Sequence, residues 1–238
     1  METSENRVRI NKYVAENFNV SRREADRLIE AGKVFLNGRK AILGDKISLN
    51  DKVDLKDKEK IKKNFAYYAY YKPRGLITNR QHKGEKDIAT SVNIKGVFPI
   101  GRLDKDSEGL ILLTNNGRIT DRLLNPKYDH EKEYLVKTKT PIKEHQLRVM
   151  QRGMELEGDL ETKPCKTKYI DENTFRITLS EGKKHQIRRM CDAFGIAIDT
   201  LKRIRVMNIK IGDLKPGQFR KITGEDLEEL LYSLEYFK

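Results

Sequence analysis

Hydrophobic and polar positions at the start of the chain predict a small module of helices and strands. Residues 9–18 and 21–31 carry apolar side chains at helical spacing, and the second run begins with the capping-box sequence Ser-Arg-Arg-Glu. Residues 34–36 predict a strand that ends at an Asn-Gly turn, and strands near 40–43 and 52–55 follow. The pattern is typical of a compact module of about 50 residues.

A run of charged residues separates this module from the rest of the chain. Residues 57–64 offer too little apolar surface to pack against anything, so they predict a linker. We therefore predict three parts: a module over residues 1–57, a linker over 58–65 and a second domain over 66–238.

The second domain mixes strand and helix patterns and predicts the α+β class. Strands are predicted over residues 65–71, 97–100, 110–114, 132–138, 158–170, 174–179 and 202–211. Helices are predicted over residues 118–124, 141–150 and 183–194, and after a cap at Thr223. A polar loop is predicted over residues 79–90, and a change of phase near Val206-Met207 predicts a β-bulge.

One charged loop lies between two apolar strands and is the strongest candidate for chemistry. Gly101 and Gly109 permit tight backbone at its two ends. Its charged side chains are those of Arg102, Asp104, Lys105, Asp106 and Glu108. Loops on a rigid scaffold often carry function, but a solvated turn is the alternative.

Net charge makes nucleic acid the leading partner class. The chain has 238 residues and a formal net charge of +13, and 36% of its residues are charged. Such a protein is attracted to polyanions. No apolar run approaches the roughly 18 residues that a membrane span needs, and the first residues have no signal-peptide character, so we expect a cytoplasmic protein.

Cysteines and histidines predict neither a disulfide nor a metal site. Cys165 and Cys191 are isolated and lack the spacing of a zinc motif, so we interpret both as reduced, structural thiols. The histidines are scattered along the sequence: His82, His130, His145 and His185.

Basic side chains concentrate in two places. In the first module they fall on helix starts and polar faces, where phosphate contacts are expected. The candidates there are Arg22, Arg23 and Arg27. The helix predicted over residues 183–194 carries a second dense positive field near its N-terminus, for which RNA phosphate is a natural partner. A solvated surface is the alternative for both fields.

These residues leave three functions open. The charged loop could belong to an aspartate-dependent enzyme acting on RNA. It could also hold Mg²⁺ on Asp104, Asp106 and Glu108 in a nuclease. In a third reading the protein binds RNA without catalysis, and Asp104 is only a turn residue.

Two sets of motifs resemble known families. In the first module, Arg-Ile-Asn-Lys-Tyr, Ser-Arg-Arg-Glu-Ala-Asp and Gly-Lys-Val-Phe-Leu-Asn-Gly resemble the S4 RNA-binding domain. The second domain contains, in order, Lys-Pro-Arg-Gly, Gly-Arg-Leu-Asp, Glu-Tyr-Leu-Val and Gly-Lys-Lys-His-Gln-Ile-Arg-Arg-Met. These resemble the motifs of the RsuA/RluB/RluF branch of pseudouridine synthases, most closely the RluF subgroup that acts on large-subunit ribosomal RNA.

The resemblance implies a fold and a reaction. The fold is a small S4 domain followed by a catalytic domain with a mixed, mainly antiparallel sheet and flanking helices. The reaction breaks the glycosidic C–N bond of a flipped-out uridine and reattaches the base through carbon. Asp104 matches the catalytic aspartate, acting as nucleophile or base. Tyr134 matches the tyrosine that stacks on the target base, and Arg188 matches the arginine that pairs with the catalytic aspartate. Arg102 matches the arginine that fills the place in the RNA that the flipped uridine has left.

The resemblance also implies the partners. We expect a large-subunit ribosomal RNA stem-loop as substrate, with a tRNA left open as a second one, a monomeric protein, and no metal or organic cofactor. Some members carry a long basic C-terminal tail that this sequence lacks, a difference that concerns docking to ribosomal RNA rather than the chemistry. Besides Arg102 and the arginines of the first module, the expected RNA contacts are Lys72, Lys105, Lys184, Gln186 and Arg189.

Overall fold

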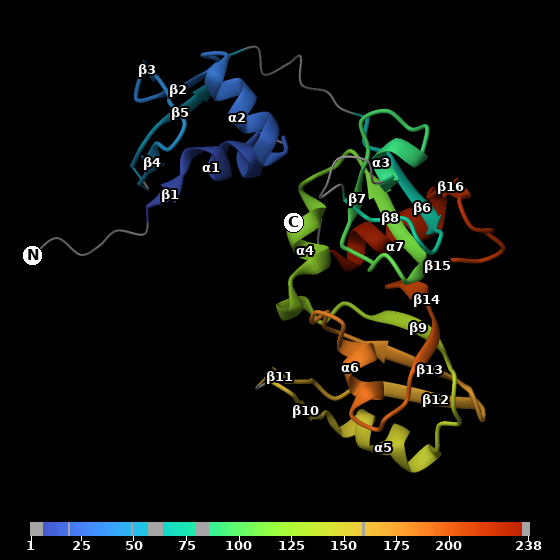
Figure 1. Cartoon of the computed structure of the whole chain (residues 1–238). Helices are drawn as coiled ribbons and strands as arrows, with labels where there is room; N and C mark the ends of the chain where they lie inside the picture. Colours follow the sequence, from blue (N-terminus) through green and yellow to red (C-terminus); the bar gives the residue numbers. More distant parts are fainter. Residues whose placement is uncertain are drawn as a thin grey trace, which may run out of the picture. The chain divides into compact units, whose positions relative to one another are not determined.

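The structure is a computed structural model of the chain, and it forms two compact units (Figure 1). It describes residues 7–18, 20–48, 50–56, 64–79, 86–158 and 160–234. One unit comprises Met1–Phe65 with Asn116–Thr120, and the other comprises Ala66–Asn115 with Asp121–Lys238. Residues 58–63 of the predicted linker lie outside the described residues. None of the helices in the described part of the chain is long and apolar enough to cross a membrane.

The described part of the first unit contains two helices and five short strands. In chain order they are β1 (Val8–Arg9), α1 (Ile10–Asn17), α2 (Arg22–Glu30), β2 (Val34–Leu36), β3 (Arg39–Lys40), β4 (Lys46–Ile47) and β5 (Val53–Leu55). Strands pair in the orders β1-β4 and β3-β2-β5. Val14, Ala25 and Val34 are fully buried in the core that the helices and strands share.

Helix α2 begins where its sequence predicts. The Ser21 hydroxyl accepts a hydrogen bond from the backbone N–H of Glu24, which satisfies one of the free donors of the first turn. Ala25 and Ile29 face the core. The side chains of Arg22, Arg23 and Arg27 are exposed. Helix α2 therefore presents its arginines to solvent.

The second unit is built on a sheet of nine strands. Its strands are β6 (Tyr67–Lys72), β7 (Phe98–Ile100), β8 (Glu108–Thr114), β9 (Lys132–Thr138), β12 (Lys166–Asp171), β13 (Thr174–Leu179), β14 (Ile198–Val206), β15 (Ile209–Lys210) and β16 (Phe219–Lys221). The main order is β12-β13-β9-β14-β8-β6-β16, with β15 paired to β14 and β7 paired to β8. Every pairing is antiparallel except that of β14 with β8. The predicted α+β fold with a mainly antiparallel sheet is confirmed.

The parallel pairing of β14 with β8 is the junction between two halves of the sheet. It is short, joining Lys202 to Glu108 and Arg203 to Gly109. Gly109 has a φ of +104°, and a Cβ there would lie 2.3 Å from the carbonyl oxygen of Arg203. Glycine is therefore required at this point of close backbone approach.

Helices cover each half and complete its core. They are α3 (Ile88–Ser91), α4 (Ile119–Leu124), η2 (Pro126–Tyr128, a 3₁₀ turn), α5 (Glu144–Arg152), α6 (Gln186–Asp192) and α7 (Gly224–Ser233). Helices α5 and α6 pack on the half that contains β9, β12 and β13 (Figure 1). Phe175, Ile177 and Met190 are fully buried there. In the other half Tyr70 and Ile111 pack beneath α3.

Several predicted boundaries are wrong, mainly where turns interrupt a pattern. The strand predicted over 158–170 is instead a hairpin of β10 (Glu155–Leu156) and β11 (Leu160–Glu161), followed by β12. The predicted bulge near Val206-Met207 is the turn between β14 and β15, where Met207 has a φ of +52°. Helices α5 and α6 begin three residues later than predicted, at Glu144 and Gln186. The predicted loop over 79–90 runs into α3, and residues 80–85 lie outside the described residues.

Candidate active site

Asp104 lies in the loop of residues 101–107 between β7 and β8, close to the junction of the two sheet halves. Its side chain is 41% exposed, so a ligand can approach the carboxylate. Nε2 of His185, the residue before α6, lies 3.5 Å from Oδ1 of Asp104. Two loops far apart in the sequence therefore meet at this carboxylate.

Hydrogen bonds from other elements hold the backbone of the Asp104 loop. The Thr78 hydroxyl donates to the carbonyl of Leu103 at 2.8 Å and accepts from the N–H of Leu103 at 3.0 Å. The N–H of Gly75 donates to the carbonyl of Lys105 at 2.7 Å. A loop fixed on both sides of Asp104 presents its carboxylate in a defined position, as catalysis requires.

Arg188 of α6 also contacts this loop. Its Nη2 donates to the carbonyl of Asp106 at 3.2 Å and lies 3.3 Å from the Ser107 hydroxyl. Among the described residues, the basic side chain that contacts the Asp104 carboxylate is His185, whereas Arg188 contacts the backbone next to it. Two side chains at the start of α6, those of His185 and Arg188, thus contact the Asp104 loop.

Lys72 is a fully buried cation at the end of β6. Its ammonium donates to the carbonyls of Leu76 at 2.5 Å and Pro73 at 3.1 Å. Burial lowers the pKa of Lys72 to about 8, and the carboxylates of Asp104, Asp106 and Glu108 oppose that shift. An RNA contact by Lys72, expected from sequence, does not fit this burial, because all its surface is covered by protein.

Arg203 is a second buried cation beside the loop, and the sequence analysis did not identify it. Its side chain is 4% exposed; Nε donates to the carbonyl of Leu110 at 2.7 Å and Nη1 to that of Arg102 at 3.4 Å. The local sequence gives no indication that this strand residue is buried. Its contact with the Asp104 loop is seen only when β14 is paired with β8. Arg203 joins β14 to the start of the Asp104 loop and to β8, which follows the loop.

Tyr134 lies on β9 in the half of the sheet that α6 covers. It pairs in register with Arg203 of β14 and with Ile177 of β13. It is half-buried and packs against the core cluster that contains Met190 of α6. Its strand is thus next to the junction that carries the Asp104 loop.

Glu108, a ligand in the Mg²⁺ alternative, is engaged elsewhere. Its Oε2 accepts a hydrogen bond from the Tyr71 hydroxyl at 3.0 Å. Burial, together with the neighbouring Glu108 carboxylate, raises the pKa of Tyr71 to about 12. The Lys202 ammonium lies 4.7 Å from the centre of the Tyr71 ring.

Both cysteines, Cys165 and Cys191, are free thiols. Burial raises the pKa of the Cys191 thiol to about 12.

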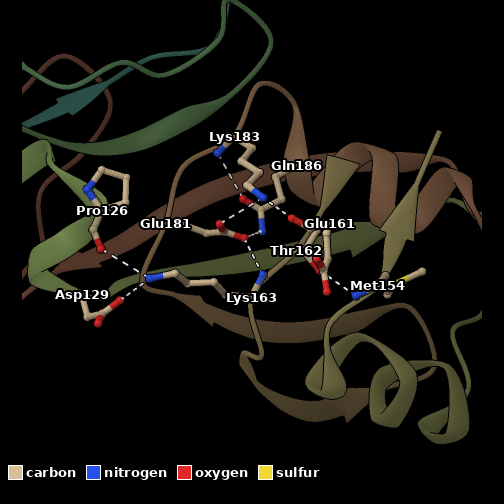
Figure 2. A network of polar contacts seen from close by, with 9 residues as sticks. All are labelled: Pro126, Asp129, Met154, Glu161, Thr162, Lys163, Glu181, Lys183 and Gln186. Atoms are coloured by element: carbon tan, nitrogen blue, oxygen red, sulfur yellow. Dashed lines mark hydrogen bonds and ion pairs between the residues drawn. The ribbon is translucent and has the colours of Figure 1, made fainter. Parts of the chain in front are cut away.

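The remaining RNA-contact candidates divide by exposure. Arg102, Lys105 and Lys184 are exposed. Gln186 is only 3% exposed, and its amide is bonded to Glu181 and to the N–H of Lys183 (Figure 2), so it holds the protein together rather than facing RNA. Arg189 donates to the carbonyl of Glu157 in the β10–β11 hairpin.

Comparisons with known proteins give a family match in each of the two units. Residues 66–193 match the family described as RNA pseudouridylate synthase, and residues 8–53 match the S4 domain. The dual-specificity RNA pseudouridine synthase RluF of Escherichia coli K12 is 42% identical over 96% of this chain and 80% of its own. The ribosomal large subunit pseudouridine synthase B of Bacillus subtilis is 34% identical, over 93% of this chain and 95% of its own. A crystal structure of a pseudouridylate synthase superposes with a TM-score of 0.70 at 29% identity, covering 94% of this chain and 99% of that one.

Proposed function

Because the chain belongs to the RNA pseudouridylate synthase family, we propose that it converts a specific uridine of 23S ribosomal RNA to pseudouridine through Asp104. Family membership makes it an enzyme and removes the nuclease and the non-catalytic binder from the three alternatives. The position of Asp104 carries the proposed mechanism, because it is a partly exposed carboxylate on a loop held from several elements.

The proposed reaction conserves all atoms. The bond from the sugar C1′ to N1 of uracil breaks, the base rotates in the site, and C1′ bonds to C5. C5 then loses its proton and N1 gains one. Asp104 acts at the sugar as nucleophile or as base, and either role needs an ionised carboxylate within reach of the flipped nucleotide.

Base flipping assigns a role to Arg102. A uridine stacked in an RNA helix cannot reach a carboxylate in a protein loop, so it must leave the stack. Arg102 is exposed and lies two residues before Asp104, and its backbone is held by Arg203. We assign its guanidinium to the place that the uridine vacates.

Tyr134 and Arg188 complete the proposed site. Tyr134 offers an aromatic ring for stacking on the flipped base and a hydroxyl for handling its proton. Arg188 donates to the carbonyl of Asp106, two residues after Asp104, and we assign it to pair with the Asp104 carboxylate when RNA binds. Its planar fork can fix a carboxylate in two directions at once.

The RNA partners follow from the relatives. The name of the Bacillus subtilis relative specifies the large ribosomal subunit, which supports a 23S stem-loop as substrate. The Escherichia coli relative is named as dual-specific, which supports a second RNA, for which a tRNA is our candidate. Exposed Arg22, Arg23 and Arg27 of α2 supply phosphate contacts in the first unit.

Substitution of Asp104→Asn tests the proposal, since the amide keeps the shape but can act neither as nucleophile nor as base. Single-turnover conversion of a 23S stem-loop, read by carbodiimide mapping, should fall by at least about 100-fold while RNA affinity stays near wild type. Asp106→Asn is the control and should be mild, because Asp106 is an exposed neighbour in the same loop. Turnover above a few per cent in Asp104→Asn would reject the mechanism.

A further inference from the structure

His185 approaches the Asp104 carboxylate from an unusual backbone conformation. Its φ is 55° and its ψ is 26°, in the left-handed region that residues other than glycine seldom occupy. Such conformations are energetically unfavourable and are often found at functional sites. His185 precedes α6 as its N-cap, yet its side chain makes no capping hydrogen bond. The imidazole lies instead beside Oδ1 of Asp104.

A buried carboxylate fixes the segment that carries His185. Glu181 is 4% exposed, and its Oε1 accepts hydrogen bonds from the N–H of Lys163 at 2.9 Å and from Nε2 of Gln186 at 2.6 Å. Its Oε2 lies 3.6 Å from the ammonium of Lys183. Gln186 in turn accepts from the N–H of Lys183 at 3.1 Å. Figure 2 shows Glu181 at the centre of these contacts.

The network closes around the residues on both sides of His185. Lys183 is held through its backbone and its ammonium, and Gln186 is held through both ends of its amide. Lys163 extends the network to Asp129 at 2.7 Å, and Lys183 donates to the carbonyl of Glu161 (Figure 2). A buried carboxylate is unfavourable without such partners, so Glu181 strongly favours this one arrangement of the segment.

We propose that His185 orients the Asp104 carboxylate for reaction and that the buried Glu181 holds His185 in place for this task. The inference rests on the proposed role of Asp104. Both residues are positioning residues, since His185 acts on the carboxylate and Glu181 acts on His185. Because Nε2 lies 3.5 Å from Oδ1, we assign the Oδ1 side of the carboxylate to His185 and leave Oδ2 for the nucleotide.

Two variants of His185 separate orientation from folding. His185→Gly accepts a φ of 55° without steric cost but removes the imidazole, so its stability should match wild type while its single-turnover rate falls about 10- to 100-fold. His185→Gln keeps an N–H donor near the position of Nε2 and should recover most of that rate. His145→Gln, on the exposed face of α5, is the matched control and should leave the rate unchanged.

The RNA dissociation constant distinguishes orientation from RNA contact. If His185 orients Asp104, the His185→Gly variant should bind RNA with an unchanged dissociation constant and an unchanged salt dependence. If the rate at saturating enzyme stays at wild type, or if affinity falls and the salt slope drops by about 0.7 to 0.9, His185 does not orient Asp104 and the proposal is rejected.

A double-mutant cycle tests the part played by Glu181. Glu181→Gln should lower the rate about 10-fold in the wild-type background and less than about 2-fold in the His185→Gly background, because both changes then affect the same step. Equal losses in both backgrounds would show that Glu181 does not act through His185. If Glu181→Gln is not folded, Gln186→Met removes the two hydrogen bonds of the Gln186 amide, keeps Glu181, and should show the same coupling at smaller size.

Asp104→Asn, assayed beside these variants, separates the two proposals. An active Asp104→Asn would reject the proposed function itself. An inactive Asp104→Asn together with a fully active His185→Gly would retain the function and reject only the role of His185.

Discussion

The basic side chains of the first unit and those around the Asp104 loop are the same residue types in opposite surroundings. Arg22, Arg23 and Arg27 of α2 are exposed. Lys72 and Arg203 are 0% and 4% exposed, and their donors are hydrogen-bonded to backbone carbonyls. Net charge alone does not distinguish the two sets.

This difference teaches what a cation can do in each place. An exposed arginine can exchange counterions for RNA phosphate, which gives affinity that depends on salt. A buried cation has left water at a large cost, and it repays that cost only through fixed partners within the protein. We therefore propose that the first set serves RNA binding, whereas the second holds the backbone around the Asp104 loop.

Removing Arg203 should produce the largest effect on stability. Arg203→Met leaves the carbonyls of Leu110 and Arg102 without their donor at the junction, which should lower the free energy of unfolding by about 3–5 kcal/mol. Chemical denaturation followed by circular dichroism measures it. Arg22→Met, with the same change at an exposed site, should stay within about 0.5 kcal/mol. Similar losses in both variants would contradict the comparison.

Lys72 should control the alkaline side of the activity profile. With its pKa near 8, Lys72 loses its proton above that pH, and the carboxylates of Asp104 and Asp106 lose a neighbouring positive charge. The single-turnover rate of wild type should therefore fall above pH 8. Lys72→Met should be about 100-fold slower and should lack this decline, because it has no proton to lose. A decline of the same size in Lys72→Met would assign it to another group.

The same pKa predicts how stability changes with pH. An unfolded chain keeps Lys72 protonated to about pH 10.4, while the folded protein releases the proton near pH 8. Between these two pH values the unfolded state binds more protons than the folded state, so the contribution of Lys72 to the free energy of unfolding rises with pH. Below pH 8 Lys72 is charged in both states, and the full cost of burying its charge lowers stability. The difference in unfolding free energy between wild type and Lys72→Met, measured from pH 7 to 10, should therefore shift in favour of wild type. If the difference in unfolding free energy between the two proteins does not change from pH 7 to 10, the lowered pKa of Lys72 is contradicted.

Arg188 should tolerate lysine poorly although the charge is kept. Lysine cannot reproduce the planar fork with which we propose that Arg188 pairs with the Asp104 carboxylate, so Arg188→Lys should lose about 10-fold or more in single-turnover rate at saturating enzyme. Arg189→Lys, next on the same helix, is the control, because Arg189 contacts the β10–β11 hairpin instead of the Asp104 loop. A near wild-type rate for Arg188→Lys would make Arg188 one more phosphate-binding cation.

The arginines of α2 should affect binding alone, with the smallest effect of these changes on the chemical step. Replacing Arg22, Arg23 and Arg27 together by glutamine should reduce the slope of log affinity against log salt by about 2 to 3. The single-turnover rate at saturating enzyme should not change. An unchanged slope would mean that α2 does not touch RNA.

Local patterns predicted most elements because their signals lie within a few neighbouring residues. Ser21 and the apolar spacing after it predicted α2, and the apolar run of β8 predicted a buried strand. The errors occurred where the chain turns without a strong local signal. Met207, with a positive φ, ends β14 at a position that favours no turn by its side chain, and the strand pattern resumes in β15.

For the site, the sequence by itself determined which loop carries Asp104, the family, and the strand and helix that present Tyr134 and Arg188. Only the tertiary structure decided that Lys72, Gln186 and Arg203 are buried, and that His185 rather than Arg188 lies against Asp104. The reason is physical. A residue type sets the chemistry that a side chain can perform, but its burial and its partners depend on which segments fold against it. For Lys72 and Arg203 these segments include strands that are distant in the sequence, such as β14 and β8.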